Sequence, residues 1–128
     1  GVVEALVLRS STGERQQPTR ATLTVDGGLD GDRWAGGKAL RGEQISVMNL
    51  DVAEAIANGQ SIVLFGDNVF TRLDLGALCL TVGTRLWLGG ALTEVSAVPH
   101  TPCTQFRERF GEAAFECVAK TQRLRGIY

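Results

Sequence analysis

The chain has 128 residues, which is enough for one domain that buries roughly two thirds of the surface its unfolded form exposes. Its 13 Lys and Arg residues nearly balance 14 Asp and Glu residues, and the net charge is −1. No run of like charges interrupts this balance, so we expect neither a nucleic acid nor a membrane surface as partner. The three cysteines show no CxxC pair and no zinc-type spacing, and we recognise neither a signal peptide nor a membrane-spanning apolar run. These features predict a cytoplasmic protein.

The first half of the chain alternates between strand-like and turn-like segments. Residues 2–8 are rich in Val and Leu and predict a buried first strand. Residues 22–25 and 44–48 alternate between apolar and polar side chains and predict two further short strands. Asn49 is a suitable N-cap for a helix over residues 50–58, which would cover a sheet.

The loop Gly28-Leu29-Asp30-Gly31-Asp32-Arg33-Trp34 combines glycines, acids, an arginine and a large aromatic residue. It admits two interpretations. In the first, Asp side chains cap a turn and Trp34 closes the core. In the second, the loop carries Asp32 and Arg33 to a binding cleft. The sequence favours neither.

The triplet Gly66-Asp67-Asn68 interrupts an otherwise apolar run over residues 62–70. A tight bend here would expose a carboxylate and an amide. An ordinary Asp-Asn turn is the simpler alternative and the favoured one.

The strongest hairpin signals lie between residues 78 and 97. Residues 78–82 alternate, residues 85–88 and 91–97 read as strands, and Gly89-Gly90 fits a two-residue turn. Cys79 would pack within the first of these strands. Many short strands at close spacing predict a mostly β fold, either a barrel or a strongly coiled sheet, with a few peripheral helices.

A second helix is predicted over residues 108–121. Its apolar residues recur at steps of three and four and would face the sheet. Cys117 belongs to this stripe and is expected in the core. Residues 126–128 read as the start of another strand.

The stretch Pro99-His100-Thr101-Pro102-Cys103 carries a thiol and the chain's single histidine between two rigid prolines. Cys103 would lie just before a helix N-terminus, where the helix dipole and free N–H groups favour a thiolate. Arg107 and Arg109 would add positive charge. The alternatives are a small buried hydrophobic cysteine and a structural histidine.

Four of these segments, taken in order, resemble the signatures of the MOSC domain, named after the C-terminal domain of molybdenum cofactor sulfurases. They are Gly28-Leu29-Asp30-Gly31-Asp32-Arg33, Phe65-Gly66-Asp67-Asn68, Pro102-Cys103 and Arg125-Gly126-Ile127-Tyr128. The resemblance spans nearly the whole chain and is to a stand-alone, bacterial-type member. It implies a single domain over residues 1–128, a mostly β barrel with peripheral helices, and a cleft that holds the cysteine.

The resemblance also implies a chemistry. The domain would bind the molybdenum cofactor (molybdopterin), with Cys103 as a persulfide sulfur carrier or as the molybdenum ligand. The reaction would be sulfur transfer or the reduction of N-hydroxylated compounds, and whether the chain itself is an enzyme stays open. The matching polar positions, expected to contact the cofactor, are Asp32, Asn68 and Arg125. Arg33 and His100 are expected to contact it as well.

The chain departs from the family pattern in three ways. Gly-Asp-Asn-Val stands where Gly-Glu-Asn-Leu is usual, which shortens the carboxylate by one methylene. The family's last strands do not follow the Arg125 motif, so an unpaired edge could be covered by a second copy or another chain. Pyridoxal phosphate is expected only in a partner cysteine desulfurase, and a molybdoenzyme is another possible partner. The alternative function is a non-catalytic module that binds a small ligand or anion, or another protein, on the same barrel.

Overall fold

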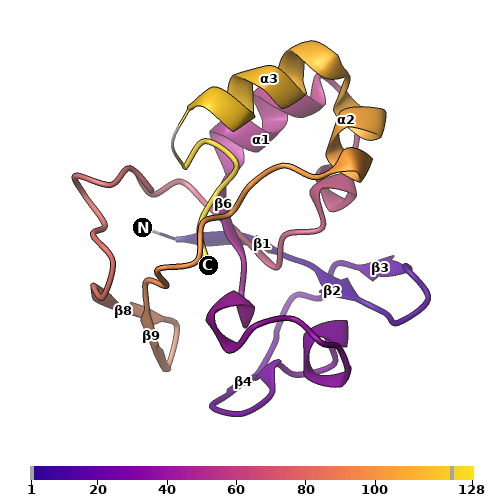
Figure 1. The fold of residues 1–128 in the computed structure, drawn as a ribbon. Helices are drawn as coiled ribbons and strands as arrows, with labels where there is room; N and C mark the ends of the chain where they lie inside the picture. The colour runs from indigo at the N-terminus through magenta and orange to yellow at the C-terminus, as the bar shows by residue number, and fades with distance from the viewer. Residues whose placement is uncertain (1, 122) are drawn as a thin grey trace.

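A small mixed sheet lies at the centre of the computed structural model, which describes residues 2–121 and 123–128 (Figure 1). Its strands are β1 (Val3–Leu6), β7 (Val69–Thr71) and β6 (Val47–Asn49), in the order β1-β7-β6. β1 pairs with β7 antiparallel, whereas β6 pairs with β7 parallel. All three residues of β7 are buried, as expected for the middle strand of this sheet.

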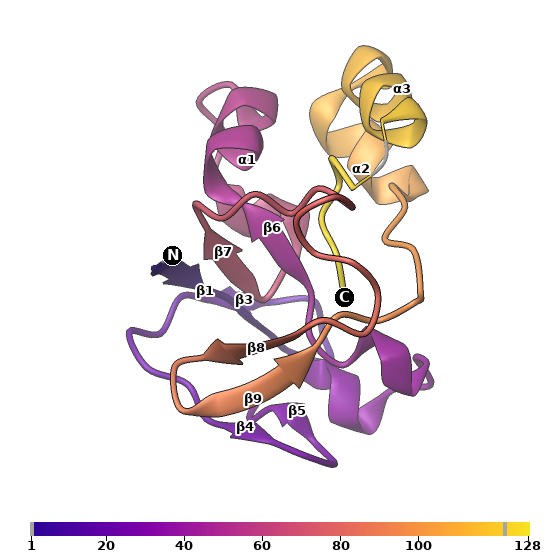
Figure 2. The same ribbon diagram turned by 90° about the vertical axis from the view of Figure 1, so that its left-hand side faces the viewer.

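The remaining strands form three separate hairpins. They are β2 (Leu8–Arg9) with β3 (Arg15–Gln16), β4 (Leu23–Thr24) with β5 (Gly28–Leu29), and β8 (Arg85–Leu88) with β9 (Ala91–Glu94). Three short 3-10 helices lie in other connections: η1 (Arg33–Gly36) and η2 (Arg41–Glu43) between β5 and β6, and η3 (Ile62–Phe65) just before β7. Figure 2 shows the hairpins β4–β5 and β8–β9 on one side of the central sheet and the α-helices on the other.

Three α-helices cover the opposite side. α1 (Leu50–Ala57) begins where predicted, because the Asn49 side chain accepts a hydrogen bond from Val52 N at 3.1 Å. The single helix predicted over residues 108–121 is instead two helices, α2 (Thr104–Phe110) and α3 (Glu112–Lys120). Gly111 separates them with φ of +92°, a conformation that ends a regular helix.

Two clusters of buried hydrophobic side chains hold these parts together. The larger cluster joins the sheet to the helices and contains Val7, Met48, Leu50, Ala53, Ala57, Phe65, Phe70, Phe106 and Val118. The smaller one joins the β8–β9 region to the C-terminal segment and contains Leu75, Leu80, Val95 and Ile127. The polar side chains of the candidate site lie between the elements that these two clusters hold in place.

The barrel prediction is not confirmed. Among the described residues the strands form one three-stranded sheet and three hairpins, and none of these sheets closes on itself. The β8–β9 hairpin and the short strand at residues 23–24 are confirmed. The protein therefore combines small strand-rich sheets with three helices.

Residues 78–82 were wrongly predicted as a strand. They form turns instead, with Leu78 fully exposed and Cys79 also exposed rather than packed. Asp74 Oδ1 accepts a hydrogen bond from Gly76 N at 2.8 Å, and the Gly76 carbonyl then accepts from the N–H groups of Cys79 and Leu80. These local bonds satisfy the backbone groups that a strand would need.

Two further expectations change at the ends of the chain. Cys117 is exposed rather than in the core, because α3 turns Val118 inward. The first strand is shorter than residues 2–8 and starts at an exposed Val3. The expected strand at residues 126–128 is represented by an antiparallel bridge between Ile127 and Val47.

No helix in the described part of the chain is both long and apolar enough to span a bilayer.

Candidate functional site

Asp32 is a buried carboxylate that closes the first of the four motif loops. It caps η1 by accepting a hydrogen bond from Trp34 N at 3.1 Å. Arg9, from β2, donates Nε to Oδ1 at 3.1 Å and Nη2 to Oδ2 at 2.8 Å, and its backbone N–H donates to Oδ1 at 2.8 Å. Burial alone would raise the pKa of Asp32, but the hydrogen bonds and charge of Arg9 outweigh it and hold the pKa below its ordinary value.

Asn68 connects this ion pair to the central sheet. Its amide nitrogen donates to Asp32 Oδ1 at 3.1 Å and to Val7 O at 3.2 Å, and its amide oxygen accepts from Ser46 N at 3.2 Å. The predicted exposure of this amide is wrong, since Asn68 is 1% exposed. Gly66, with φ of +75°, turns the chain so that the polar triplet points inward.

Asp67 forms a second buried ion pair, with Arg125. Arg125 Nη1 donates to Asp67 Oδ2, and its Nη2 donates to Phe65 O at 2.9 Å. The guanidinium carbon also lies 5.8 Å from the Phe65 ring centre and 5.5 Å from that of Phe106. Asp67 is fully enclosed, so this pair fixes the C-terminal segment against the triplet.

His100 touches the same carboxylate from the proline-rich loop. Its Nδ1 lies 3.4 Å from Asp67 Oδ1, and its ring stacks on Tyr128 with ring centres 4.4 Å apart. Burial lowers the pKa of His100 to about 4, although the charge of Asp67 partly opposes this effect. The imidazole is therefore neutral at pH 7.

Cys103 lies at the surface, three residues beyond His100. It occupies the N-cap position of α2 as predicted, but its thiol makes no capping hydrogen bond. A cavity of about 210 Å³ next to this loop is lined in part by His100, Thr101 and Pro102. The thiol is accessible, and the alternative of a buried hydrophobic cysteine is wrong.

The two cations expected beside the thiol are directed elsewhere. Arg107 Nε binds Glu112 Oε2 at 2.8 Å, and its guanidinium lies 3.9 Å from the centre of the Phe115 ring. Arg109 Nη1 donates to Leu64 O at 2.8 Å. They hold α2 to α3 and to η3, so they do not supply the positive environment that the sequence suggested.

The structure thus brings four of the six predicted site residues into one buried polar cluster and leaves two at the surface. We define the buried polar cluster as Arg9, Asp32, Ser46, Asp67, Asn68, His100 and Arg125. Arg33 lies outside it and is exposed on η1, and Cys103 lies at the surface beyond His100.

Sequence reasoning missed Arg9, Ser46 and Asp67 as members of this cluster. For Asp67 a signal existed, because a carboxylate inside a nine-residue apolar run must find a buried partner. For Arg9 and Ser46 nothing local indicates the pairing, which joins segments more than twenty residues apart.

Within the described residues, no group of three or more His, Cys, Asp or Glu side chains could hold a metal ion. Comparison with protein-family models, with curated proteins and with solved structures finds no match for this chain. The site must therefore be interpreted from its own chemistry.

Proposed function

We propose that this chain is a MOSC-type domain that binds the molybdenum cofactor and uses Cys103 as its reactive thiol. One observation carries the proposal. The segments behind the resemblance are separated by up to about ninety residues, yet Asn68 binds Asp32, Arg125 binds Asp67, and His100, three residues before Cys103, lies against Asp67. Motifs that form one cluster in space are expected when they serve one site.

The thiol fits the proposed group, and the buried residues fit a supporting role. Cys103 supplies an exposed soft donor, which suits both molybdenum ligation and sulfur carriage. Most polar atoms of Asp32, Asn68 and Arg125 are already bonded to protein groups, so these residues would hold the surrounding loops. Arg33 is exposed and retains a guanidinium that could bind a phosphate. The bound cofactor would supply the metal centre for sulfur or N-hydroxyl chemistry.

An exposed thiol suits sulfur delivered by another protein. The Cys103 thiolate would attack the outer sulfur of a persulfide on a partner cysteine desulfurase. A new S–S bond would form at Cys103 while the donor's S–S bond breaks and the donor leaves as a thiolate. The transfer involves no net oxidation or reduction, because one S–S bond forms as another breaks. No oxidant is therefore needed.

Metal and pterin retention test this function. Protein produced in a molybdenum-replete host is analysed for molybdenum and, after oxidation, for pterin fluorescence. The Cys103→Ser chain is compared with Cys117→Ser, because Cys117 is also an exposed thiol on a helix. We expect molybdenum and pterin in the wild type and in Cys117→Ser, and at least tenfold less molybdenum in Cys103→Ser.

A wild-type protein that carries neither molybdenum nor pterin, and that cannot be loaded with the isolated cofactor, would overturn the proposal. The proposal also includes the family's β barrel, a cytoplasmic location and a sulfur-donating or molybdoenzyme partner. If the proposal fails this test, the alternative, a non-catalytic binding or interaction module, is the function to pursue.

A further inference from the structure

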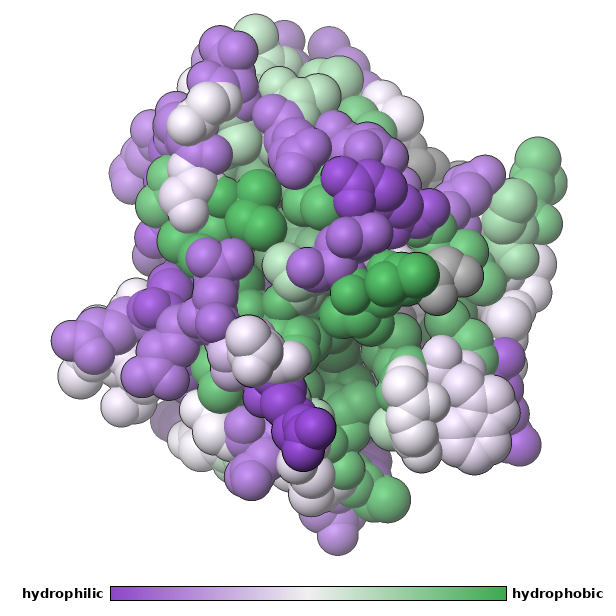
Figure 3. Space-filling model, turned by 180° about the vertical axis from the view of Figure 1, so that it is seen from behind, coloured by the Kyte–Doolittle hydropathy of each residue, from purple (hydrophilic) through white to green (hydrophobic). Residues whose placement is uncertain are grey.

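A large apolar cavity lies away from Cys103, on the hairpin side of the molecule. Its volume is about 1040 Å³, and it is enclosed by β8–β9 together with residues of β1, β4 and β6. Figure 3 shows hydrophobic side chains gathered around a hollow on this face. The walls include Val3, Leu23, Leu75, Leu86 and Leu88. This volume lies just above the usual range of about 300–1,000 Å³ for pockets that bind small molecules.

The charged groups in the wall are already compensated. Among the described residues, only Arg41 and Glu94 carry charge there. Glu94 Oε2 binds Arg85 Nε at 3.2 Å, and Arg41 Nη2 lies 3.5 Å from Asp26 Oδ1 while donating to Val25 O at 3.1 Å. A charged ligand would lose its hydration without gaining an unpaired counter-ion, so the cavity favours a neutral one.

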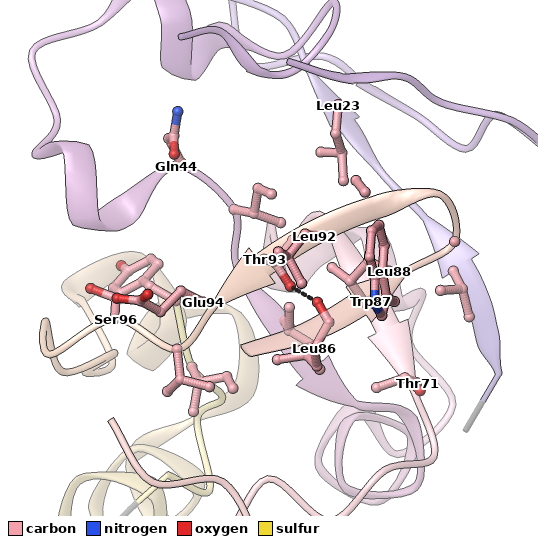
Figure 4. Close-up of a pocket in the computed structure, with 18 of the residues that line it drawn as sticks. Leu23, Gln44, Thr71, Leu86, Trp87, Leu88, Leu92, Thr93, Glu94 and Ser96 are labelled. Carbon is pink, nitrogen blue, oxygen red and sulfur yellow. Dashed lines mark hydrogen bonds between the residues drawn. The ribbon is translucent and has the colours of Figure 1, made fainter. Parts of the chain in front are cut away.

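Polar groups gather at one end of the cavity. Figure 4 shows Gln44, Glu94 and Ser96 toward one side and Leu23, Trp87 and Leu88 toward the other. Tyr128 also lines the cavity, and no hydrogen bond joins its hydroxyl to another described residue.

The Tyr128 ring stacks on His100, and its hydroxyl can donate or accept a hydrogen bond. Gln44 uses its side-chain nitrogen on Val25 O, at 2.6 Å. Its amide oxygen remains as an acceptor. A donor and an acceptor are therefore both available at this end.

We propose that this cavity binds a neutral, mainly apolar small molecule whose one polar end, a hydroxyl or carbonyl, lies toward Gln44, Ser96 and Tyr128. Cys103 does not line this cavity, although the cavity shares Ser96 and Ile127 with the smaller one beside the Cys103 loop. The proposal does not depend on cofactor binding. Trp87 is 67% exposed and Leu92, its cross-strand partner, is 53% exposed, so they present an apolar lip at which such a molecule would enter. A ligand that covered these two side chains would remove their apolar surface from water, which favours binding.

The neutral fluorophore N-phenyl-1-naphthylamine tests the site. We expect saturable binding of one molecule per chain, with energy transfer from Trp87. Trp87→Ala should weaken binding of the probe several-fold, because it removes part of the apolar lip, whereas Trp87→Phe, which keeps an aromatic side chain there, should bind it nearly as well as the wild type. The anionic analogue 1-anilinonaphthalene-8-sulfonate, which has the same aromatic system with an added sulfonate, should bind at least tenfold more weakly.

A filling variant provides the second measurement. Ala91→Phe places a ring in the cavity wall and should weaken binding of the neutral probe at least tenfold, while Ala113→Phe, at an exposed position on α3, should not. Equal binding of both probes, or equal binding by both variants, would overturn the proposal. So would light scattering that shows a dimer from which the probe is excluded, since a second copy would then cover the cavity.

Discussion

The Oδ1 atom of Asp67 lies 3.4 Å from Nδ1 of His100, and both atoms are enclosed without a regular hydrogen-bond partner. The other oxygen of the carboxylate is held by Arg125. The guanidinium therefore supplies the counter-charge to this buried carboxylate, while the neutral imidazole packs against it without adding charge. Four measurable consequences follow from this cluster and from the surfaces around it.

Acid should destabilise the protein through His100. Because its folded pKa of about 4 lies below the value of 6.5 for an unperturbed histidine, the unfolded chain binds this proton more readily. The free energy of unfolding should fall by roughly 3 kcal/mol as the pH drops from above 6.5 to about 4. Urea unfolding across this range measures the loss, and His100→Asn should remove this component. Parallel pH profiles for the two proteins would contradict the assignment, which is unambiguous because the chain has one histidine.

Breaking the Asp67–Arg125 pair should be costly. In Asp67→Asn the guanidinium of Arg125 stays buried without its counter-charge, and we expect a loss of about 3–5 kcal/mol in the free energy of unfolding. The double variant Asp67→Asn/Arg125→Met removes both charges and should be more stable than Asp67→Asn alone. Chemical denaturation of the three proteins measures this. A single variant within 1 kcal/mol of wild type would show that the pair is dispensable.

The three thiols should differ in reactivity although all are exposed. The Cys79 thiol donates to Asp74 Oδ2 at 3.2 Å, and this hydrogen bond, together with the charge of Asp74, raises the pKa of Cys79. Cys79 should therefore alkylate more slowly than Cys103 at pH 8. Asp74→Asn should accelerate the labelling of Cys79 several-fold and leave Cys103 unchanged. Iodoacetamide labelling with peptide mass mapping measures each rate, and an unchanged Cys79 rate in the variant would count against this bond.

Gly126 should not tolerate a side chain. It has φ of +112°, and a Cβ there would lie 2.5 Å from Val47 O. Gly126→Ala should therefore cost about 2–4 kcal/mol of stability, from steric overlap in addition to backbone strain. Gly83→Ala is the matched control, since Gly83 also has positive φ but nothing within 4 Å of the added carbon. Thermal or urea unfolding measures the stability of both variants. Equal losses of stability would contradict the predicted overlap with Val47 and attribute the loss to backbone strain alone.

Local patterns in the sequence were enough to predict some of the structural elements and to identify the polar motifs. The Asn49 cap, the Gly89-Gly90 turn and the N-cap position of Cys103 all depend on short-range chemistry and are found in the structure. Asp32, Asn68 and Arg125 were selected by motif and His100 by its place beside Cys103, and the structure brings these four residues together.

What could not be predicted depends on long-range geometry. The residues around Arg9 do not indicate that it pairs with Asp32. The alternation at residues 78–82 does not indicate that the Asp74 side chain, just before them, stabilises a turn. Burial of Cys117 was inferred from helical spacing, but Gly111 resets that spacing by splitting the helix. Sheet closure likewise depends on strand partners that alternation does not specify.

The pairing of Val47 with Ile127 also constrains how the protein is made. Two backbone hydrogen bonds, of 2.8 and 2.9 Å, join residues eighty positions apart, and Arg125 reaches Asp67 from the same segment. During synthesis the ribosome releases the Arg9–Asp32 pair early, whereas Asp67 emerges long before its counter-charge. Until Arg125 leaves the exit tunnel, burying Asp67 would leave its carboxylate uncompensated, so the triplet should stay hydrated and the adjacent apolar cluster open. Newly made chains would therefore expose this apolar cluster until Arg125 has been released.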